Sequence, residues 1–232
     1  MSTFIDVARS YKNLKHQNEA LMWLTDHIDE DLWNQFLNTW RQQPAQMPTQ
    51  GIITPELMHH LTGYRADSFD ATFCHSFNVM LKETGFDQDA EALAMLMANL
   101  QHESANFIFM KEISDGKYLD FRSDLGNDRP GDGPRYKGCG PLQVTGKTHF
   151  RHFYSWLKDK RGLDDPRIIT EGSNYVADHY PFEIAIDWIQ RNHLLDVCQK
   201  QGFDACCVRI NGGHNGWADR HQKYEHAKRI LT

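Results

Sequence analysis

Residues 90–103 read AEALAMLMANLQHE, and this stretch decides the kind of fold that the chain adopts. Its apolar residues follow Asp87 and Asp89, either of which can cap a helix, and they predict a helix over about 90–102. The uninterrupted apolar run, Ala92–Ala98, is far shorter than the roughly 18–20 residues that a membrane span requires. The stretch therefore predicts an apolar helix inside a soluble domain.

The part of the chain before this helix divides into an appendage and a linker. Residues 1–41 carry apolar side chains at helical spacing and predict a small helical appendage, which is too short to bury much core unaided. Residues 42–53 contain two prolines, a glycine and few apolar side chains, which is typical of a linker. The main domain, residues 54–232, then begins with Thr54 as an N-cap and Pro55 at the first helical position.

The part of the chain after the apolar helix loses its periodicity between Lys111 and Gly146, where glycine and proline are frequent. Long loops inside a compact domain are usually functional or disordered, and the tyrosines of this one argue against disorder. Helical spacing resumes at Thr148, returns near 175–189 and 204–210, and ends in a last helix after a glycine-rich turn. The predicted fold class is mainly α, with at most a small hairpin in the loop region.

Composition and charge exclude several classes of protein. The 232 residues are 40% hydrophobic and 24% charged, which is ordinary for a folded soluble chain. The net charge is −6 and no basic block occurs, so we expect no nucleic-acid partner. Asp6 and Arg9 stand where a signal peptide needs an apolar core, and we therefore expect cytoplasmic synthesis without a signal peptide. The 5 cysteines, with no CxxC pair, predict reduced thiols and no zinc ribbon.

Two glutamates are the strongest candidates for catalysis. His102-Glu103 is not a zinc protease motif, because Asn106 stands where the second histidine would be. Glu103 ends the apolar helix, where partial desolvation favours the protonated carboxyl that a general acid needs. Glu112 follows nine positions later. From the residues alone, two surface charges are the simpler interpretation, and a Cys/His nucleophile also stays open.

The spacing of the two glutamates sets a geometric condition. In one continuous helix they would lie on opposite faces, about 13 Å apart along the axis. They can converge only if the chain turns between them, and Ser-Ala-Asn at 104–106 can break the helix. An inverting glycosidase holds its two carboxyl groups about 6.5–9.5 Å apart, which leaves space for a water molecule. The spacing is compatible with such a pair if the backbone turns.

Several motifs occur in a fixed order along the main domain: LQHES at 100–104, KEI at 111–113, DLGN at 124–127, PGDGPRYKGCGPLQVTG at 130–146, and RINGGHNG at 209–216 with Asp219-Arg220 after it. In order and spacing, they resemble glycoside hydrolase family 19, and most closely its bacterial and phage endolysin branch. The resemblance covers about residues 52–232, and the first 41 residues lie outside it.

This resemblance implies a lysozyme-like, two-lobed, mainly α fold. It also implies cleavage of β-1,4 bonds beside N-acetylglucosamine or N-acetylmuramic acid, with inversion at the anomeric carbon and without a metal or other cofactor. By position, Glu103 matches the general acid, Glu112 the general base, and Thr145 a hydroxyl residue that helps to hold the attacking water. The positions that match sugar-binding residues are Tyr136, Gln143, Asn211 and Arg220.

The expected function is that of a peptidoglycan hydrolase of the muramidase type, an endolysin. We expect a monomer that stays in the host cytoplasm until release and then acts on peptidoglycan glycan strands, without membrane insertion. A chitinase is the alternative of the same class, because chitin shares the N-acetylglucosamine backbone. From other classes, a non-catalytic wall-binding or virion protein and a Cys-dependent peptidase or amidase remain alternatives. Residues 1–41 are expected to bind the wall or a partner.

Some positions depart from the family pattern or compete for a role. Ser114 competes with Thr145 for the water, and Asp120 is a reserve for the second carboxylate. Cys139 replaces a family arginine, which removes a cation, and His149 stands where asparagine is common.

Structural interpretations stand beside the functional ones. Thr145 could cap the next helix, and Gln143 and Tyr136 could make hydrogen bonds within the loop. Asn211 could belong to a turn only, and Arg220 could form an ordinary salt bridge or pair with a catalytic carboxylate.

Overall fold

A computed structural model describes Asp29 and residues 51–232. The chain divides into two units, Met1–Thr49 and Gln50–Thr232, and residues 51–232 belong to the second. Apart from Asp29, the expected appendage lies outside the described residues, as does most of the expected linker. Ile53 falls inside the expected linker, yet its side chain is 2% exposed and its backbone pairs with the Asn78 amide. The folded unit therefore begins before residue 54.

The described residues of this unit form helices joined by turns and loops. The longer helices are α4 (Pro55–Thr62), α5 (Ala71–Thr84), α6 (Ala90–Glu103), α8 (Lys147–Arg161), α11 (Pro181–Arg191), α12 (Leu194–Asn211) and α13 (Trp217–Leu231). The shorter ones are η2 (Ala66–Ser68), η3 (Phe86–Gln88), η4 (Lys117–Leu119), η5 (Ser123–Leu125), α7 (Asp132–Arg135), α9 (Arg167–Thr170) and α10 (Ser173–His179). The mainly α prediction is confirmed. Within residues 51–232, no helix has the length and apolarity to cross a bilayer.

The predicted helix ends are confirmed at several places. The Thr54 hydroxyl accepts a hydrogen bond from a backbone N–H of the first turn of α4, and Pro55 occupies the first helical position. Gly63 ends α4 in the left-handed conformation, which glycine adopts without steric cost. Of the two candidate caps for α6, Asp89 is the one used, since its carboxylate accepts from Ala92 N–H at 3.0 Å.

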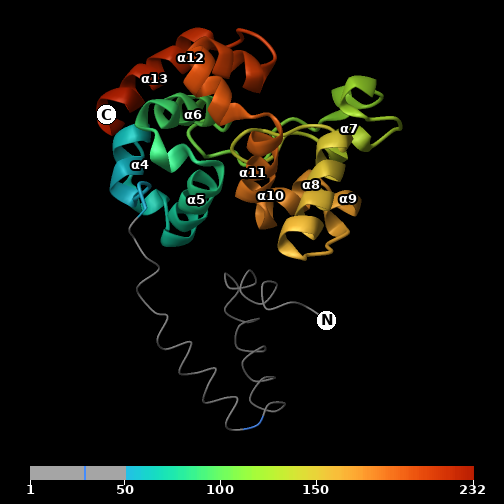
Figure 1. Cartoon of the computed structure of the whole chain (residues 1–232). Coiled ribbons are helices and arrows are strands. Elements are labelled where there is room, and N and C mark those ends of the chain that lie inside the picture. The colour runs from blue at the N-terminus through green and yellow to red at the C-terminus, as the bar shows by residue number, and fades with distance from the viewer. Residues whose placement is uncertain (1–28, 30–50) are drawn as a thin grey trace. The chain divides into compact units, whose positions relative to one another are not determined.

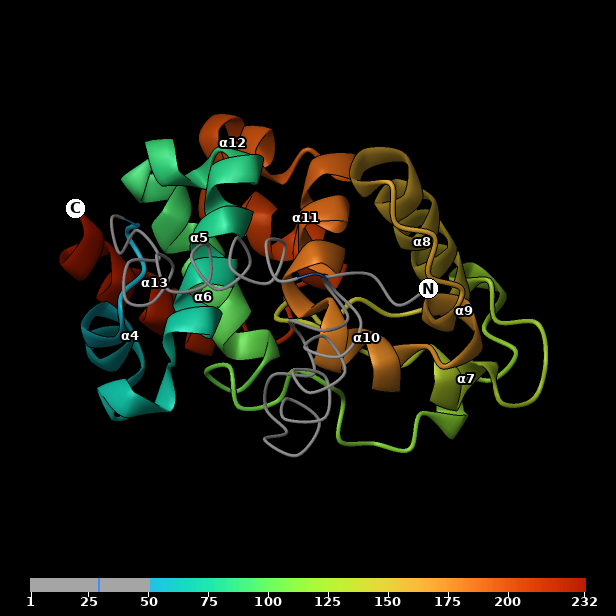
Figure 2. The same cartoon turned by 90° about the horizontal axis from the view of Figure 1, so that it is seen from below.

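Helix α6 forms the centre of one of two groups of helices. Ten consecutive residues, Ala92–Gln101, are buried, and α12 and α13 pack against the helix. Figures 1 and 2 show α4, α5, α6, α12 and α13 on one side and α7, α8, α9 and α10 on the other. Helix α11 contacts α5 and α8, and so joins the two groups. This arrangement agrees with the two-lobed expectation.

The structure differs from the sequence prediction in the last third of the chain. The helical pattern over 175–189 is two helices, α10 and α11, which are separated at Tyr180 before Pro181. Proline removes a backbone donor, so a new helix starts there more readily than the old one continues. Helix α12 begins at Leu194, ten residues before the predicted start, and kinks at Gly202, where φ is 79°.

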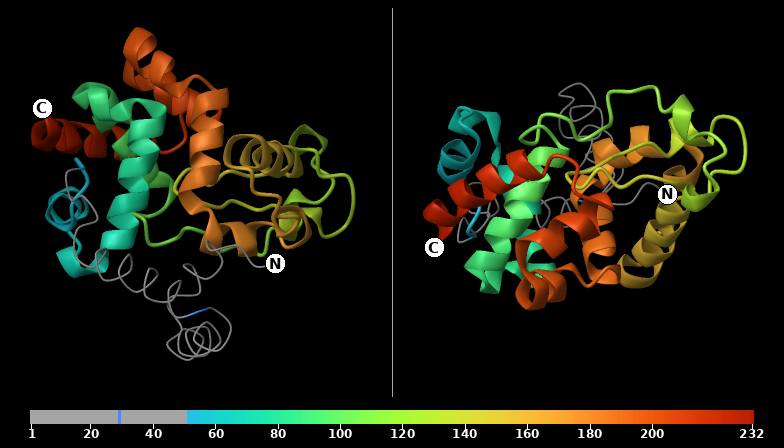
Figure 3. Two further views of the ribbon diagram at one scale, coloured as in Figure 1. Left: turned by 60° about the horizontal axis from the view of Figure 1, so that its bottom comes forward. Right: turned by 90° about the horizontal axis from the view of Figure 1, so that it is seen from above.

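The predicted irregular stretch runs between the two groups of helices, as Figure 3 shows. It contains only η4, η5 and the short α7. Antiparallel β-bridges join Lys111 to Cys139 and Cys139 to Val144, so three short segments lie side by side with Cys139 in the middle. This pairing corresponds to the small hairpin that the sequence allowed.

Buried polar contacts hold the rest of this stretch. Lys147 forms ion pairs with Asp128 at 2.7 Å and Asp132 at 2.9 Å, although its side chain is only 6% exposed. The Asn127 amide donates to Leu119 O and accepts from Lys147 N–H. The loop is therefore ordered by internal bonds, which fixes the residues that it carries.

Acid is expected to weaken the second helix group through Asp165. Burial acts to raise the pKa of this carboxylate, but hydrogen bonds from Arg167, Tyr175 and Tyr180 outweigh it and lower the pKa to about 2. Because the pKa of Asp165 is lower in the folded than in the unfolded protein, its ionised carboxylate stabilises the folded state above about pH 4. This stabilisation is lost as the pH falls from about 4 to about 2. Asp165→Asn should cost about 2 kcal/mol at pH 7, and less below pH 4.

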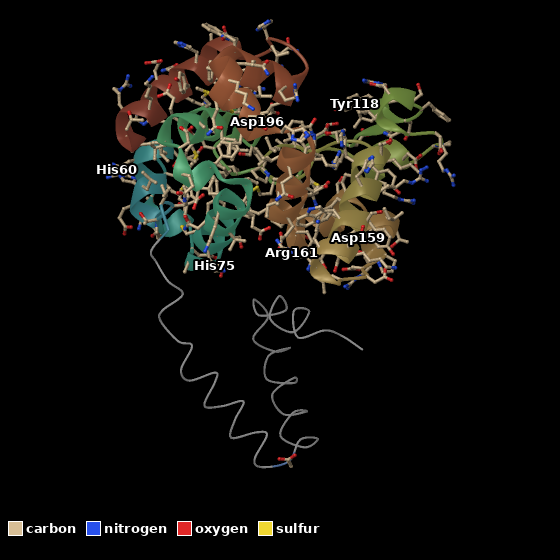
Figure 4. All side chains as sticks on the ribbon, in the orientation of Figure 1. His60, His75, Tyr118, Asp159, Arg161 and Asp196 are labelled. Carbon is tan, nitrogen blue, oxygen red and sulfur yellow. The ribbon has the colours of Figure 1, made fainter. Side chains whose placement is uncertain are left out.

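Urea unfolding at pH 7 and pH 3 measures this difference. Asp159→Asn is the matched control, because Asp159 is exposed on α8 (Figure 4). If Asp165→Asn lowers the free energy of unfolding by the same amount at both pH values, the ionised carboxylate of Asp165 is not the source of the stabilisation.

Candidate active site

A left-handed turn separates the two candidate glutamates. Helix α6 ends at Glu103, and the next backbone reversal places Ala105, Asn106 and Phe107 at φ values of 49°, 58° and 69°. This conformation costs roughly 1–2 kcal/mol for each residue other than glycine. The Ser104 hydroxyl supports the turn by accepting from Phe107 N–H at 2.8 Å. The predicted helix breaker at 104–106 is confirmed.

The turn returns the chain to the end of α6. Phe109 N–H donates to Ser104 O at 2.9 Å, so Phe109 lies beside the residue that follows Glu103. Glu112 is three residues further on, and three extended residues span only about 10 Å. A continuous helix would instead have carried Glu112 about 13 Å along the axis to the opposite face.

Glu103 forms an ion pair with a buried arginine. Arg220 Nη2 donates to Glu103 Oε1 at 2.5 Å, and their side chains are 2% and 19% exposed. Arg220 also donates to Asn99 Oδ1 at 2.8 Å and to Asn215 O at 3.2 Å. These bonds join the last turn of α6 to the first turn of α13. Arg220 therefore pairs with a candidate catalytic carboxylate, and it is too buried to serve as an exposed sugar-binding residue.

A hydrogen-bonded pair of side chains lies next to this ion pair. His102 Nδ1 is 2.6 Å from Asp219 Oδ2, which joins the same two helices. Burial acts to raise the pKa of Asp219, but hydrogen bonds from Lys223 and His102 outweigh it and leave the pKa below its usual value. Gly216, with φ at 70°, lies against the His102 ring, where an added Cβ would be 2.3 Å away. A side chain at this position would strain the backbone and displace the His102 ring.

Glu112 is held by three hydrogen bonds. Its backbone N–H donates to Gly138 O at 2.8 Å, and Gly138 N–H donates to its Oε2 at 2.9 Å. The Tyr118 hydroxyl donates to its Oε1 at 2.8 Å. The two side-chain contacts hold both carboxylate oxygens of Glu112 in place.

Thr145 directly follows the segment that pairs with Gly138–Gly140. Its hydroxyl donates to Gln143 O at 2.9 Å, so its lone pairs remain available to accept a proton from water. Helix α8 has Gly146 as its N-cap and no side-chain cap, which excludes the interpretation of Thr145 as a helix cap. Because the neighbouring bridge joins Cys139 to Val144, Thr145 and Glu112 lie on either side of the central segment.

Three predicted sugar-binding residues have structural contacts. Tyr136 is 1% exposed and its hydroxyl donates to Ile169 O at 2.9 Å, so this residue belongs to the core, which corrects the prediction. The Gln143 amide donates to Phe109 O and Gly140 O, both at 3.0 Å. The Asn211 amide donates to carbonyls of the following turn, at 3.3 and 3.4 Å.

The two reserve residues also have local roles. Asp120 Oδ1 accepts from Gly131 N–H at 3.0 Å and Gly133 N–H at 2.7 Å, and so fixes the start of α7. Ser114 Oγ accepts from Gly116 N–H at 3.0 Å within its own turn. These contacts leave Glu112 and Thr145 as the better candidates for the base and the water-binding hydroxyl.

The cysteines are poorly suited to nucleophilic catalysis. All five are buried, and burial raises the pKa of Cys74 to about 11 and that of Cys139 well above its usual value. Reactive cysteines are instead accessible and have lowered pKa values. Among the described residues, no group of three or more His, Cys, Asp or Glu side chains is placed to bind a metal ion.

Two contacts of the site were missed by sequence reasoning. Tyr118 lies in a loop without periodicity, where no pattern links it to Glu112, and the Gly138 contact uses a backbone N–H. The only signal for Gly138 was its place in the glycine-rich motif at 130–146.

Comparison with known proteins gives the class of fold. No family model matches the chain. An endochitinase of Arabidopsis thaliana is 32% identical over 121 residues, which are 52% of this chain and 39% of that protein. A glycosyl hydrolase family 19 domain-containing protein of Haemophilus influenzae is 25% identical, over 56% of this chain and 76% of that protein. The chain thus spans well under half the length of the plant relative.

Solved structures agree with these relatives. Chitinase C from Streptomyces griseus superposes with a TM-score of 0.56 at 15% identity, covering 79% of this chain and 95% of that one. A mutant of chitinase C gives 0.55 over 79% and 94%. The fold is therefore chitinase-like.

Proposed function

We propose that the chain hydrolyses β-1,4 bonds in the glycan strands of peptidoglycan, as an endolysin of the muramidase type. The observation that carries the proposal is the left-handed turn at 105–107, which separates two carboxylates with different partners. Glu103 contacts a buried arginine, whereas Glu112 accepts hydrogen bonds from Tyr118 and Gly138. Paired carboxyl groups in different environments can divide the roles of acid and base.

Glu103 is the proposed general acid. The guanidinium of Arg220 holds its carboxyl group at the end of α6. The contact is to Oε1 only, so a proton taken up by Glu103 would reside on Oε2. From there it can pass to the oxygen of the leaving sugar, while Arg220 keeps Oε1 in place.

Glu112 is the proposed general base, and Thr145 the second contact of the attacking water. A water molecule between them could donate one proton to the carboxylate and the other to the lone pair of the Thr145 hydroxyl. Its own lone pair would then be directed at the anomeric carbon, and the two contacts would reduce its positional freedom. Attack from the face opposite to the leaving group inverts the anomeric centre.

A chitinase is the second candidate function. The plant relative is named an endochitinase and the similar solved structures are chitinase C, and these names favour chitin. The motifs at 100–146 and 209–220 instead resemble the endolysin branch, which favours peptidoglycan. Both substrates present the same β-1,4 bond next to an N-acetylated sugar, so the same two carboxylates would serve either reaction.

Digestion of purified sacculi and of chitin tests the proposal. Mass spectrometry should find muropeptides with new reducing ends, and proton NMR should show the α-anomer first, because inversion of a β bond yields it. Chito-oligosaccharides from chitin with intact sacculi would favour the chitinase instead. New amino groups without new reducing ends would contradict both, and would indicate a peptidase or an amidase.

A further inference from the structure

Tyr118 is placed beside Glu112 by a rigid turn. It lies in η4, which packs against α7, and Figure 4 shows it at that edge of the molecule. Gly116 precedes η4 with φ at 76°, and a Cβ there would lie 2.9 Å from Gly133 O. Leu119, the next residue after Tyr118, is 4% exposed. The turn is thus fixed on both sides of Tyr118.

The ring of Tyr118 contributes little to the core, since the residue is 64% exposed. The contact that Tyr118 makes with the site is the hydrogen bond from its hydroxyl to Glu112 Oε1, at 2.8 Å. Burial of the hydroxyl and the adjacent carboxylate raise the pKa of Tyr118 to about 12. The hydroxyl therefore remains a donor throughout the pH range in which a glycosidase works.

Tyr118 and Gly138 together bind both oxygens of Glu112. The two donors are on different segments, one in η4 and one in the central segment of the paired loop. With one donor on each oxygen, the plane of the carboxylate is fixed. Without Tyr118, Oε1 loses this contact, and the carboxylate can turn about its terminal torsion, which is broad and roughly two-fold.

From these contacts we infer that Tyr118 is a positioning residue that orients the Glu112 carboxylate toward the attacking water. This inference rests on the proposed function. Tyr118 acts through Glu112 and needs no contact with the sugar. The hydroxyl is the operating group, so its removal should impair turnover without a comparable change in substrate binding or folding.

Tyr118→Phe is the direct test, with soluble glycan strands prepared from sacculi, or chitin oligosaccharides if wild type prefers them. Loss of the contact that orients the general base predicts a kcat about 10- to 100-fold lower, with KM unchanged and a Tm no lower than that of the control below. Tyr154→Phe is the matched control, because the Tyr154 hydroxyl donates to the Asp164 carboxylate away from Glu112. It should retain the wild-type kcat.

A kcat of Tyr118→Phe within two-fold of the control overturns the inference and leaves the proposed function intact. A raised KM with unchanged kcat also overturns it, because that result shows a direct sugar contact. Tyr118→Leu removes the aromatic ring as well as the hydroxyl. An equal loss of kcat in Tyr118→Phe and Tyr118→Leu would show that the hydroxyl, and not the ring, supports turnover. A wild-type protein that hydrolyses neither glycan overturns the proposed function and this inference with it.

Discussion

Glu103→Gln is expected to lower kcat by about 10²- to 10⁴-fold on whichever glycan the wild type hydrolyses. An amide has the shape of the carboxyl group but cannot supply the acidic proton that the leaving sugar needs. The glutamine oxygen can still accept the hydrogen bond from Arg220, which now reaches Glu103 at 2.5 Å. We therefore expect a folded, nearly inactive protein, to be measured by release of reducing ends and by circular dichroism.

Glu171→Gln is the matched control for this substitution. Glu171 is an exposed glutamate at the C-terminal end of α9, in the other group of helices. Its replacement should leave kcat unchanged. Full activity of Glu103→Gln would remove the proposed mechanism, whereas the same loss in both variants would point to a general effect of lost charge.

Arg220→Met is expected to give the largest loss of stability, about 3–5 kcal/mol. The arginine is 2% exposed, and its removal leaves the Glu103 carboxylate and the side-chain oxygen of Asn99 without the partner that they share. Removing one partner of a buried ion pair leaves an uncompensated charge, and this dominates the cost. Urea denaturation of the wild type and the variant at pH 7 measures the difference.

A double variant tests whether the loss arises from the ion pair. Glu103→Gln removes the charge that Arg220 compensates, so the combined variant should lose clearly less than the sum of the two single losses. Arg229→Met is the control on the same helix, because Arg229 is exposed, and its cost should stay within about 0.5 kcal/mol. Equal costs for the two arginines would contradict the role of Arg220.

The fold was predictable where local chemistry decides it. Thr54 and Asp89 cap helices as their sequence positions indicate, and the apolar residues of α6 are buried in one continuous run. The division of 175–189 and the early start of α12 were not predicted. Both depend on breaks at Pro181 and Gly202, which interrupt helical patterns that otherwise continue through them.

For the candidate site, the sequence predicted the turn but not the contacts. Ser-Ala-Asn at 104–106 indicated a break, and the break is present. Tyr136 is a core residue whose hydroxyl donates to Ile169 O outside the loop, so neither the sugar-binding role nor the hydrogen bond within the loop was correct. The loop shows no periodicity from which this burial could be predicted. The pairing of Arg220 with Glu103 links residues 117 positions apart, and it was foreseen only as one of three possible roles.

The N–H group of Gly138 has a consequence for how the protein tolerates sequence change. Because a main-chain amide supports Glu112 Oε2, no substitution of Gly138 other than to proline deletes that donor. An alanine scan would pass over it, and natural variation at position 138 would be limited by space near Gln143 more than by the donor itself. Replacing that amide with an ester by chemical synthesis would reveal its share in holding the carboxylate.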